Sequence, residues 1–291
     1  MTAPIPGSAA SDGTPASAGV PLRVVSYNIH SRRDDTAALA AVVREAAPDV
    51  VIVQEAPRRF RWRQKSAALA ESFGLVVAAG GLPSLGNLLL TSLRVRVTAI
   101  RCQRFPLTPG RHLRGAAYAE CRVGGARFLL AGSHLSTDPA ERPGQAALVK
   151  RELAAATLPV VFGADLNEGP DGPAWRTVAE GLTDAAVAAD AADRHTFSCA
   201  NPRRRIDALL VDPRVGWSGT TWSTLRRPAG PAITSPSWPT SCCRAATDPT
   251  AADQGILGRS AARRPTPAAR GWTTATGGGE DARRTGVPGR T

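Results

Sequence analysis

Four short apolar runs, each ending in polar residues, constrain the fold of this chain more than any other feature. They lie at residues 24–28, 50–55, 128–134 and 160–167. Apolar runs of this length between turn-forming residues are typical of buried strands. In open α/β sheets the binding site collects where the strands end. The sequence therefore predicts an α/β fold with one polar pocket at the ends of its strands.

The polar residues at these strand ends share one chemical character. They are two carboxylates, two carboxamides and an imidazole: Glu55, Asp165, Asn28, Asn167 and His134. Asp165 and Asn167 are two apart, so on an extended segment both side chains would point to the same side. Burying so many polar groups together is costly unless they bind a hard cation or a phosphate. The pattern predicts a metal-dependent phosphoester hydrolase.

Hydrophobic spacing and capping residues predict where several helices and turns lie. Asp35 is expected to cap a helix whose apolar residues recur three and four positions apart. Further helices are predicted at about 60–72 and 143–156. The glycine pair at 124–125 predicts a hairpin, and the last expected strand is 205–211.

Six short motifs in this chain follow one another in a known order. They are Ser-Tyr-Asn-Ile-His at 26–30, Pro-Asp-Val-Val-Ile-Val-Gln-Glu at 48–55, Gly-Asn-Leu-Leu-Leu at 86–90, Ser-His-Leu at 133–135, Gly-Ala-Asp-Leu-Asn at 163–167 and Arg-Ile-Asp at 205–207. Together they resemble the endonuclease/exonuclease/phosphatase superfamily, which has the deoxyribonuclease-I-like fold. The resemblance implies an α/β (α+β) four-layer sandwich of two mixed β-sheets flanked by helices. It also implies a Mg²⁺ site, which Mn²⁺ could also fill, at one end of the sandwich.

The resemblance also implies a role for each strand-end residue. Glu55 is expected to be the principal metal ligand, and Asn28 to help fix the metal or the phosphate. Asp165 would orient the attacking water or protonate the leaving group, and Asn167 would stabilise the developing oxyanion. His134 would donate a hydrogen bond to the scissile phosphate.

Each of these five residues has a structural alternative. Glu55 could face solvent or pair with an arginine, and Asn28 could cap a turn. Asp165 and Asn167 could form a local turn with purely local hydrogen bonds. His134 could be a buried structural histidine.

Four further residues are candidates for positions around the site. In the family, the aspartate matching Asp207 orients a catalytic histidine. Arg114, which opens a strand, is either a phosphate contact or an ordinary edge-strand arginine. Asn87 either lines the site or only stabilises the turn in which it lies. His30 follows Asn28 closely, and its role is open.

The family's Ser-Asp-His-x-Pro motif, expected near the C-terminus, is missing. No histidine follows His195, so Asp207 lacks its expected partner. Residues 214–291 contain only six residues of Leu, Ile and Val, and no Phe. So few apolar residues cannot order a segment of this length. We therefore expect the final strand to be missing or scrambled, and residues 214–291 to be a basic tail of low order.

A frameshift near Val215 explains this tail. The chain has only two lysines among its 36 basic residues, which indicates GC-rich codons. When residues 231–243 are written in such codons and translated two bases later, they give Ser-Asp-His-Phe-Pro-Val-Leu-Ala-Asp-Leu-Leu-Leu. This string holds the missing motif and an apolar strand. The third bases were chosen freely, so the match shows compatibility and not proof.

Composition and charge limit the possible domain organisation and partners of the chain. Residues 1–21 are predicted to be a disordered leader, and residues 22–213 one domain. The formal net charge is +12, and most of it lies in the tail. Basic runs at 58–63 and 203–205 could hold a nucleic-acid backbone or form solvated surfaces.

The expected partner is a phosphodiester or phosphomonoester substrate, with nucleic acid as one candidate. No stretch is apolar enough to span a membrane. Scattered cysteines without a secretory signal predict a reduced, cytoplasmic protein, and we expect a monomer. Two other functions stay open. A catalytically inactive pseudoenzyme would bind phosphate or nucleic acid without turnover, and a basic nucleic-acid-binding module would show steep salt dependence.

Overall fold

The computed structural model describes residues 20–33, 35–197 and 202–215. All of them belong to one compact unit. The predicted leader up to residue 19 and the predicted tail from residue 216 onward lie outside the described residues.

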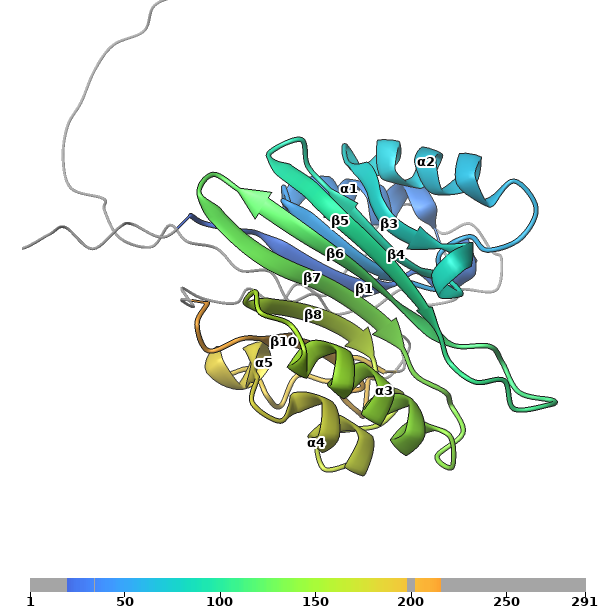
Figure 1. The fold of residues 1–291 in the computed structure, drawn as a ribbon. Helices are drawn as coiled ribbons and strands as arrows, with labels where there is room; N and C mark the ends of the chain where they lie inside the picture. The colour runs from blue at the N-terminus through green and yellow to red at the C-terminus, as the bar shows by residue number, and fades with distance from the viewer. Residues whose placement is uncertain (1–19, 34, 198–201, 216–291) are drawn as a thin grey trace, which may run out of the picture. The chain divides into compact units, whose positions relative to one another are not determined.

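The first part of the domain builds a four-stranded mixed sheet (Figure 1). Its strands, in spatial order, are β1 (Val24–Asn28), β2 (Val50–Gln54), β4 (Asn87–Thr91) and β3 (Val76–Gly81). β1 and β2 are parallel, and the other neighbours are antiparallel. Every residue of β2 and β4 is buried, as near-continuous apolar runs predict for strands covered on both faces.

The second part builds a six-stranded mixed sheet. Its strands, in spatial order, are β5 (Val95–Arg104), β6 (Gly115–Val123), β7 (Ala126–His134), β8 (Val160–Asp165), β10 (Asp207–Val211) and β9 (Thr183–Asp184). Only β7 and β8 are parallel neighbours. Gly124 has a φ of +54° in the turn between β6 and β7, which confirms the predicted hairpin.

Helices cover the outer face of each sheet. They are α1 (Thr36–Glu45), α2 (Trp62–Phe73), α3 (Arg142–Ala154), α4 (Pro173–Ala179) and α5 (Ala185–Ala188), with short 3₁₀ turns η1 (His30–Arg32) and η2 (Leu82–Ser84). α1 and α2 pack on the four-stranded sheet, and α3 and α4 on the six-stranded sheet. A third apolar cluster fills the space between the sheets. The predicted four-layer sandwich is therefore confirmed (Figure 1).

Local chemistry explains where the helices begin and end. The Asp35 side chain accepts hydrogen bonds from the backbone of Ala37 and Ala38, so it caps α1 as predicted. The helix predicted from residue 60 begins at Trp62 instead, because Arg61 has a left-handed backbone (φ +57°). Gly74 ends this helix with a φ of +74°, a conformation that glycine adopts without steric strain.

The two sheets approach each other closely just below the strand ends. A Cβ atom on Gly132 would lie 2.6 Å from Cγ2 of Ile52, and one on Gly163 would lie 2.7 Å from Cδ1 of the same residue. Ile52 is fully buried on β2, so glycines on β7 and β8 leave the room that its side chain fills. This close packing fixes the distance between the two sheets beneath the polar residues.

β1 pairs only with β2 among the described residues, so one of its edges has no neighbouring strand there. The final strand that the family leads us to expect would come from residues after 213, and most of these lie outside the described part. Within that part no helix is long and apolar enough to cross a membrane.

Candidate active site

The strand registers bring the predicted residues to one end of the sandwich. Asp165 of β8 pairs with His134 of β7 on one side and with Asp207 of β10 on the other. Asn28, at the end of β1, reaches across from the other sheet, and its Nδ2 donates to Asp165 Oδ2 at 2.9 Å. The same nitrogen lies 3.3 Å from Glu55 Oε1. One carboxamide therefore links a carboxylate from each sheet.

Glu55 follows β2 and has an unusual backbone. Its φ is +56°, in the left-handed region that residues other than glycine rarely adopt, and such strain clusters at functional sites. Its Oε2 accepts a hydrogen bond of 2.9 Å from Ser31 Oγ. Burial works to raise the pKa of Glu55, but the hydrogen bonds from Ser31 and Asn28 help to lower it below its usual value. Glu55 is thus an ionised carboxylate. Ser31 was not singled out in the sequence, because a serine in a loop carries no signal.

Asp165 lies in a different environment, because its side chain is almost fully buried. Its Oδ1 accepts from the backbone N–H of Asn167 at 3.0 Å, so the local turn weighed above is present along with the contact to Asn28. Burial raises the pKa of Asp165 above the usual value, although the hydrogen bonds from Asn28 and Asn167 oppose this. The two carboxylates of the site therefore have pKa values displaced in opposite directions.

The segment after Asp165 differs from the extended one predicted. β8 ends at Asp165, and Asn167 has a φ of +54°, which asparagine tolerates better than most residues. Its Nδ2 donates to the Leu135 carbonyl at 2.9 Å and lies 2.9 Å from Nε2 of His134. The turn therefore places Asn167 beside the imidazole.

His134 is buried, and both of its ring nitrogens face protein groups. Arg114 Nη1 lies 3.0 Å from Nδ1, and Asp165 Oδ2 lies 3.5 Å from Nε2. A guanidinium can only donate, so Nδ1 accepts from Arg114. Burial, and then the charge of Arg114, lower the pKa of His134 to about 3. His134 is therefore a neutral imidazole.

Asn87 is buried and binds backbone on two sides. Its Nδ2 donates to the carbonyls of Ser84 and Gly115, each at 2.8 Å, while its Oδ1 is buried with no partner among the described residues. These bonds join the turn before β4 to the start of β6. A substrate contact for Asn87 stays a prediction.

Asp207 lies opposite Asp165 in the β8–β10 pairing, at the expected end of the sheet. Its backbone N–H donates a hydrogen bond of 3.2 Å to Thr196 Oγ1. The family's catalytic histidine is not supplied by the sequence after Asp207. The role of Asp207 as the orienting group therefore stays a prediction.

A nearly buried ion pair behind the site ties together the loops that follow His134 and Asn167. Arg142 Nε lies 2.9 Å from Glu168 Oε2, and the two side chains are only 11% and 10% exposed. Arg142 also donates to the Thr137 carbonyl, and Glu168 accepts from the Trp175 backbone. No sequence pattern indicated this pair, because its members are 26 residues apart.

The donor set of the site suits a hard divalent cation. Within the described ranges, no three His, Cys, Asp or Glu side chains form a group that could hold a metal ion. Mg²⁺ does not need such a cage, because it keeps several waters and binds through one or two carboxylates. Ionised Glu55, half-buried beside the Asn28 carboxamide, therefore fits a magnesium-type ligand better than a zinc-type one.

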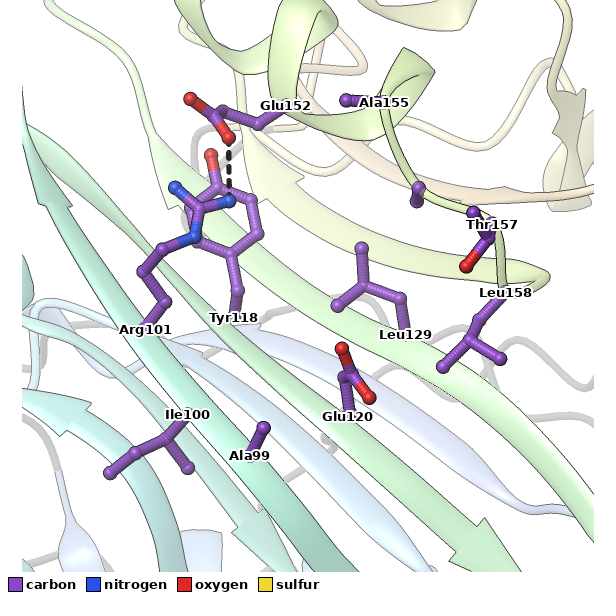
Figure 2. A pocket seen from close by; sticks show the side chains of 11 residues that line it. Ala99, Ile100, Arg101, Tyr118, Glu120, Leu129, Glu152, Ala155, Thr157 and Leu158 are labelled. Atoms are coloured by element: carbon purple, nitrogen blue, oxygen red, sulfur yellow. Dashed lines mark ion pairs between the residues drawn. The ribbon is translucent and has the colours of Figure 1, made fainter.

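A separate pocket lies on the outer face of the six-stranded sheet, near the C-terminal end of α3 (Figure 2). It has a volume of about 350 Å³. Arg101 lies over the Tyr118 ring, 4.4 Å from its centroid, and pairs with Glu152 at 2.6 Å. None of the predicted site residues lines this pocket.

A two-sheet sandwich with carboxylates, carboxamides and an imidazole at one end defines the deoxyribonuclease-I-like class of proteins. The sequence profile of the Endonuclease/Exonuclease/phosphatase family matches residues 25–239. The match spans most of the chain, so the chain belongs to this family, whose fold is that of phosphoester hydrolases.

Solved structures share the fold. Truncated TDP2 of Caenorhabditis elegans has a TM-score of 0.62 at 19% identity, over 78% of this chain and 96% of that one. A mannosyl-6-phosphatase of Bacteroides thetaiotaomicron VPI-5482 has 0.61 at 16% identity, over 78% and 98%. TDP2 of D. rerio, complexed with a single strand DNA product, has 0.58 at 17% identity, over 78% and 98%. No curated protein matches the chain in sequence.

Proposed function

We propose that this protein is a divalent-metal-dependent phosphoester hydrolase that acts on phosphodiesters. The observation that carries the proposal is that the Asn28 carboxamide contacts two carboxyl groups, Glu55 and Asp165. The pKa of Glu55 is lowered and the pKa of Asp165 is raised. Pairs of titratable groups with such divergent pKa values are typical of acid–base sites. A D. rerio relative is complexed with a DNA product, which supports a phosphodiester substrate.

Glu55 and Asn28 would hold the metal, Mg²⁺ or Mn²⁺. A divalent cation there supplies positive charge to a phosphoryl oxygen. Ser31 keeps the Glu55 carboxylate oriented, and the low pKa of Glu55 keeps it ionised.

The other residues would handle protons and developing charge. The raised pKa of Asp165 lets it hold a proton at a higher pH than an ordinary carboxyl, so it can exchange one with the attacking water or the leaving group. Neutral His134 would carry its proton on Nε2, 3.5 Å from Asp165 Oδ2. The imidazole and the Asn167 carboxamide would donate to the phosphate as its charge grows.

We further propose that activity is impaired in this chain. Asp207 is at the expected end of the sheet, but the sequence lacks the histidine that it would orient. Loss of a general base lowers rates by about 10²–10⁴-fold. A wholly inactive protein that binds phosphate or nucleic acid is the second candidate, since the same absence favours it.

Titration with Mg²⁺ and Mn²⁺ against bis(4-nitrophenyl) phosphate tests the proposal. We expect slow, metal-dependent hydrolysis that Glu55→Gln and Asp165→Asn strongly reduce and that exposed Arg59→Gln leaves unchanged. Phosphate or oligonucleotide binding with no turnover at any metal concentration would instead support the inactive binding protein.

A further inference from the structure

The loop between β1 and α1 contains three successive residues with a left-handed backbone. His30, Ser31 and Arg32 have φ values of +45°, +54° and +63°. Residues other than glycine rarely adopt this conformation, because it costs free energy. Nine such residues occur in the described part of the chain, and five of them lie in this loop or at the strand-end site, since Glu55 and Asn167 join these three. Backbone strain is therefore concentrated around the candidate metal ligand.

Backbone hydrogen bonds hold this left-handed turn beside the end of β2. The Ile29 N–H donates to the Gln54 carbonyl at 3.1 Å and so extends the pairing of β1 with β2 by one residue. The turn is closed by the Arg32 N–H, which donates to the Ile29 carbonyl at 2.8 Å. The Ile29 side chain is buried in the core between the four-stranded sheet and its helices. The backbone therefore places Ser31 next to the residue that follows β2.

The two carboxylate oxygens of Glu55 have different partners. Oε2 accepts a hydrogen bond of 2.9 Å from Ser31 Oγ, a normal length for a bond between a hydroxyl and an oxygen. Oε1 lies 3.3 Å from Asn28 Nδ2, which is longer than a usual N–H···O bond. Oε1 is therefore the oxygen that is more available to a cation.

Divalent cations differ in how they use a carboxylate. Ca²⁺ takes about six to eight oxygen ligands and often binds both oxygens of one carboxylate, whereas Mg²⁺ requires near-octahedral geometry and keeps several waters. A cation that binds both oxygens of Glu55 would compete with Ser31 for Oε2. Hydrogen bonds to a ligating carboxylate commonly tune the metal affinity of a site. The Ser31 hydroxyl is in a position to do this.

We propose that Ser31 is a positioning residue that directs Glu55 to bind Mg²⁺ or Mn²⁺ through Oε1 and thereby disfavours Ca²⁺. The assignment of a metal to Glu55 rests on the proposed function, whereas the orientation of the carboxylate by Ser31 does not. The strained turn then has a functional reason, because it brings the serine hydroxyl to Oε2.

Binding of Mn²⁺ to the whole chain, followed by electron paramagnetic resonance without substrate, tests this role independently of catalysis. Ser31→Ala should weaken Mn²⁺ binding about 10- to 100-fold. Ser31→Asn should restore much of the affinity, because asparagine tolerates a left-handed backbone and its amide can donate to Oε2. Ser72→Ala is the matched control and should leave the affinity unchanged, because the Ser72 hydroxyl bonds the Leu69 carbonyl within α2.

Ser31→Gly separates the hydroxyl from the backbone turn, because glycine adopts a left-handed conformation without steric strain. This variant lacks the donor and should bind Mn²⁺ as weakly as Ser31→Ala. Wild-type affinity in Ser31→Gly would show that the turn alone positions Glu55, and would overturn the proposal. Ser31 is exposed, so the variants should keep the melting temperature of the wild type, which is measured alongside.

Competition of Mg²⁺ and of Ca²⁺ with bound Mn²⁺ gives a readout that a purely structural role would not change. The ratio of the Kd for Ca²⁺ to the Kd for Mg²⁺ should fall at least about tenfold in Ser31→Ala, the usual effect of one hydrogen bond to a charged group. An unchanged ratio would overturn the proposal.

Glu55→Gln distinguishes a failure of this inference from a failure of the proposed function. If Glu55→Gln strongly weakens Mn²⁺ binding but Ser31→Ala binds as the wild type does, Ser31 is not a positioning residue and the assignment of Glu55 stands. If the wild type binds no Mn²⁺, or Glu55→Gln binds it equally well, both the inference and the proposed metal-dependent function are wrong.

Discussion

The two sheets present their carboxylates to the site in opposite ways. Glu55 lies directly after a strand of the four-stranded sheet and has a left-handed backbone. Its side chain is half-buried and is oriented by a hydrogen bond from the loop residue Ser31. Asp165 ends a regular strand of the six-stranded sheet, between two paired strands, and is buried. The first environment favours a charged carboxylate that can bind a cation, and the second favours a carboxyl that can keep a proton. Identical chemical groups thus lie in surroundings that favour different charge states.

The sharpest test of this difference compares Glu55→Gln with Asp165→Asn. Asp165→Asn should lower the rate about 10²–10⁴-fold with little change in the Mg²⁺ concentration that gives half the maximal rate. Glu55→Gln should lower the rate and should also raise the Mg²⁺ concentration that gives half the maximal rate. Metal titrations of diester hydrolysis measure both effects. If Asp165→Asn alters the metal requirement and Glu55→Gln does not, the two roles are reversed.

The Arg142–Glu168 ion pair should stabilise the loops next to the six-stranded sheet. Arg142→Met would leave Glu168 buried without its cation, which should lower the free energy of unfolding by about 3–5 kcal/mol. Urea unfolding measures this change. Arg142→Met combined with Glu168→Leu should recover much of the loss, and a double variant no more stable than the single one would refute the explanation.

The contact between the sheets beneath the site can be tested at Gly163. Gly163→Ala places a Cβ 2.7 Å from Ile52 Cδ1 and should destabilise the fold by about 1–3 kcal/mol. Adding Ile52→Val should restore part of the stability. Gly144→Ala is the control, because a Cβ there meets nothing within 4 Å. Equal effects at the two glycines would show that the sheets are not closely packed here.

The neutral imidazole predicts a pH dependence of stability. In the unfolded chain a histidine titrates at about 6.5, whereas burial and Arg114 lower the pKa of folded His134 to about 3. Below pH 6.5 the unfolded chain therefore takes up a proton that the folded chain does not, and stability falls by about 1.4 kcal/mol for each pH unit. Urea unfolding at pH 7, 6 and 5 should show a shallower slope for His134→Gln than for the wild type.

Asp165 should oppose this trend, because its pKa is raised on folding. Its contribution to stability is largest below the unfolded pKa of about 3.9 and falls as the pH rises through the folded value. Asp165→Asn should therefore steepen the loss of stability as the pH falls through the raised folded pKa of Asp165 toward the unfolded value. Unchanged slopes in both variants would show that neither group is perturbed by burial.

The two-sheet fold was predicted from the resemblance of the six motifs to a known family, while apolar runs marked several strands and Asp35 marked the start of one helix. The sequence also predicted the residues that the registers bring to one end of the sandwich, such as His134 and Asp165. It did not predict the left-handed turns at Glu55 and Asn167, since these depend on tertiary contacts. Polar partners distant in sequence, such as Arg142 and Glu168, were equally hidden.

Residues from 216 onward lie outside the described part of the chain, so the frameshift hypothesis stays a prediction. Sequencing the gene across codons 205–253 checks it. We expect a single-base error or slip near Val215. An uninterrupted reading frame with supporting transcript would refute the hypothesis.

The central claim is that these strand ends form the active site of a metal-dependent phosphodiesterase. It is tested most directly by restoring the other reading frame after residue 215 and measuring Mg²⁺-dependent hydrolysis of bis(4-nitrophenyl) phosphate. The restored chain should gain the missing histidine beside Asp207 and hydrolyse the diester about 10²–10⁴ times faster than the present chain. Asp165→Asn in the restored chain should remove that gain. No hydrolysis by the restored chain with Mg²⁺ or Mn²⁺, or equal activity of the two chains, would contradict the assignment.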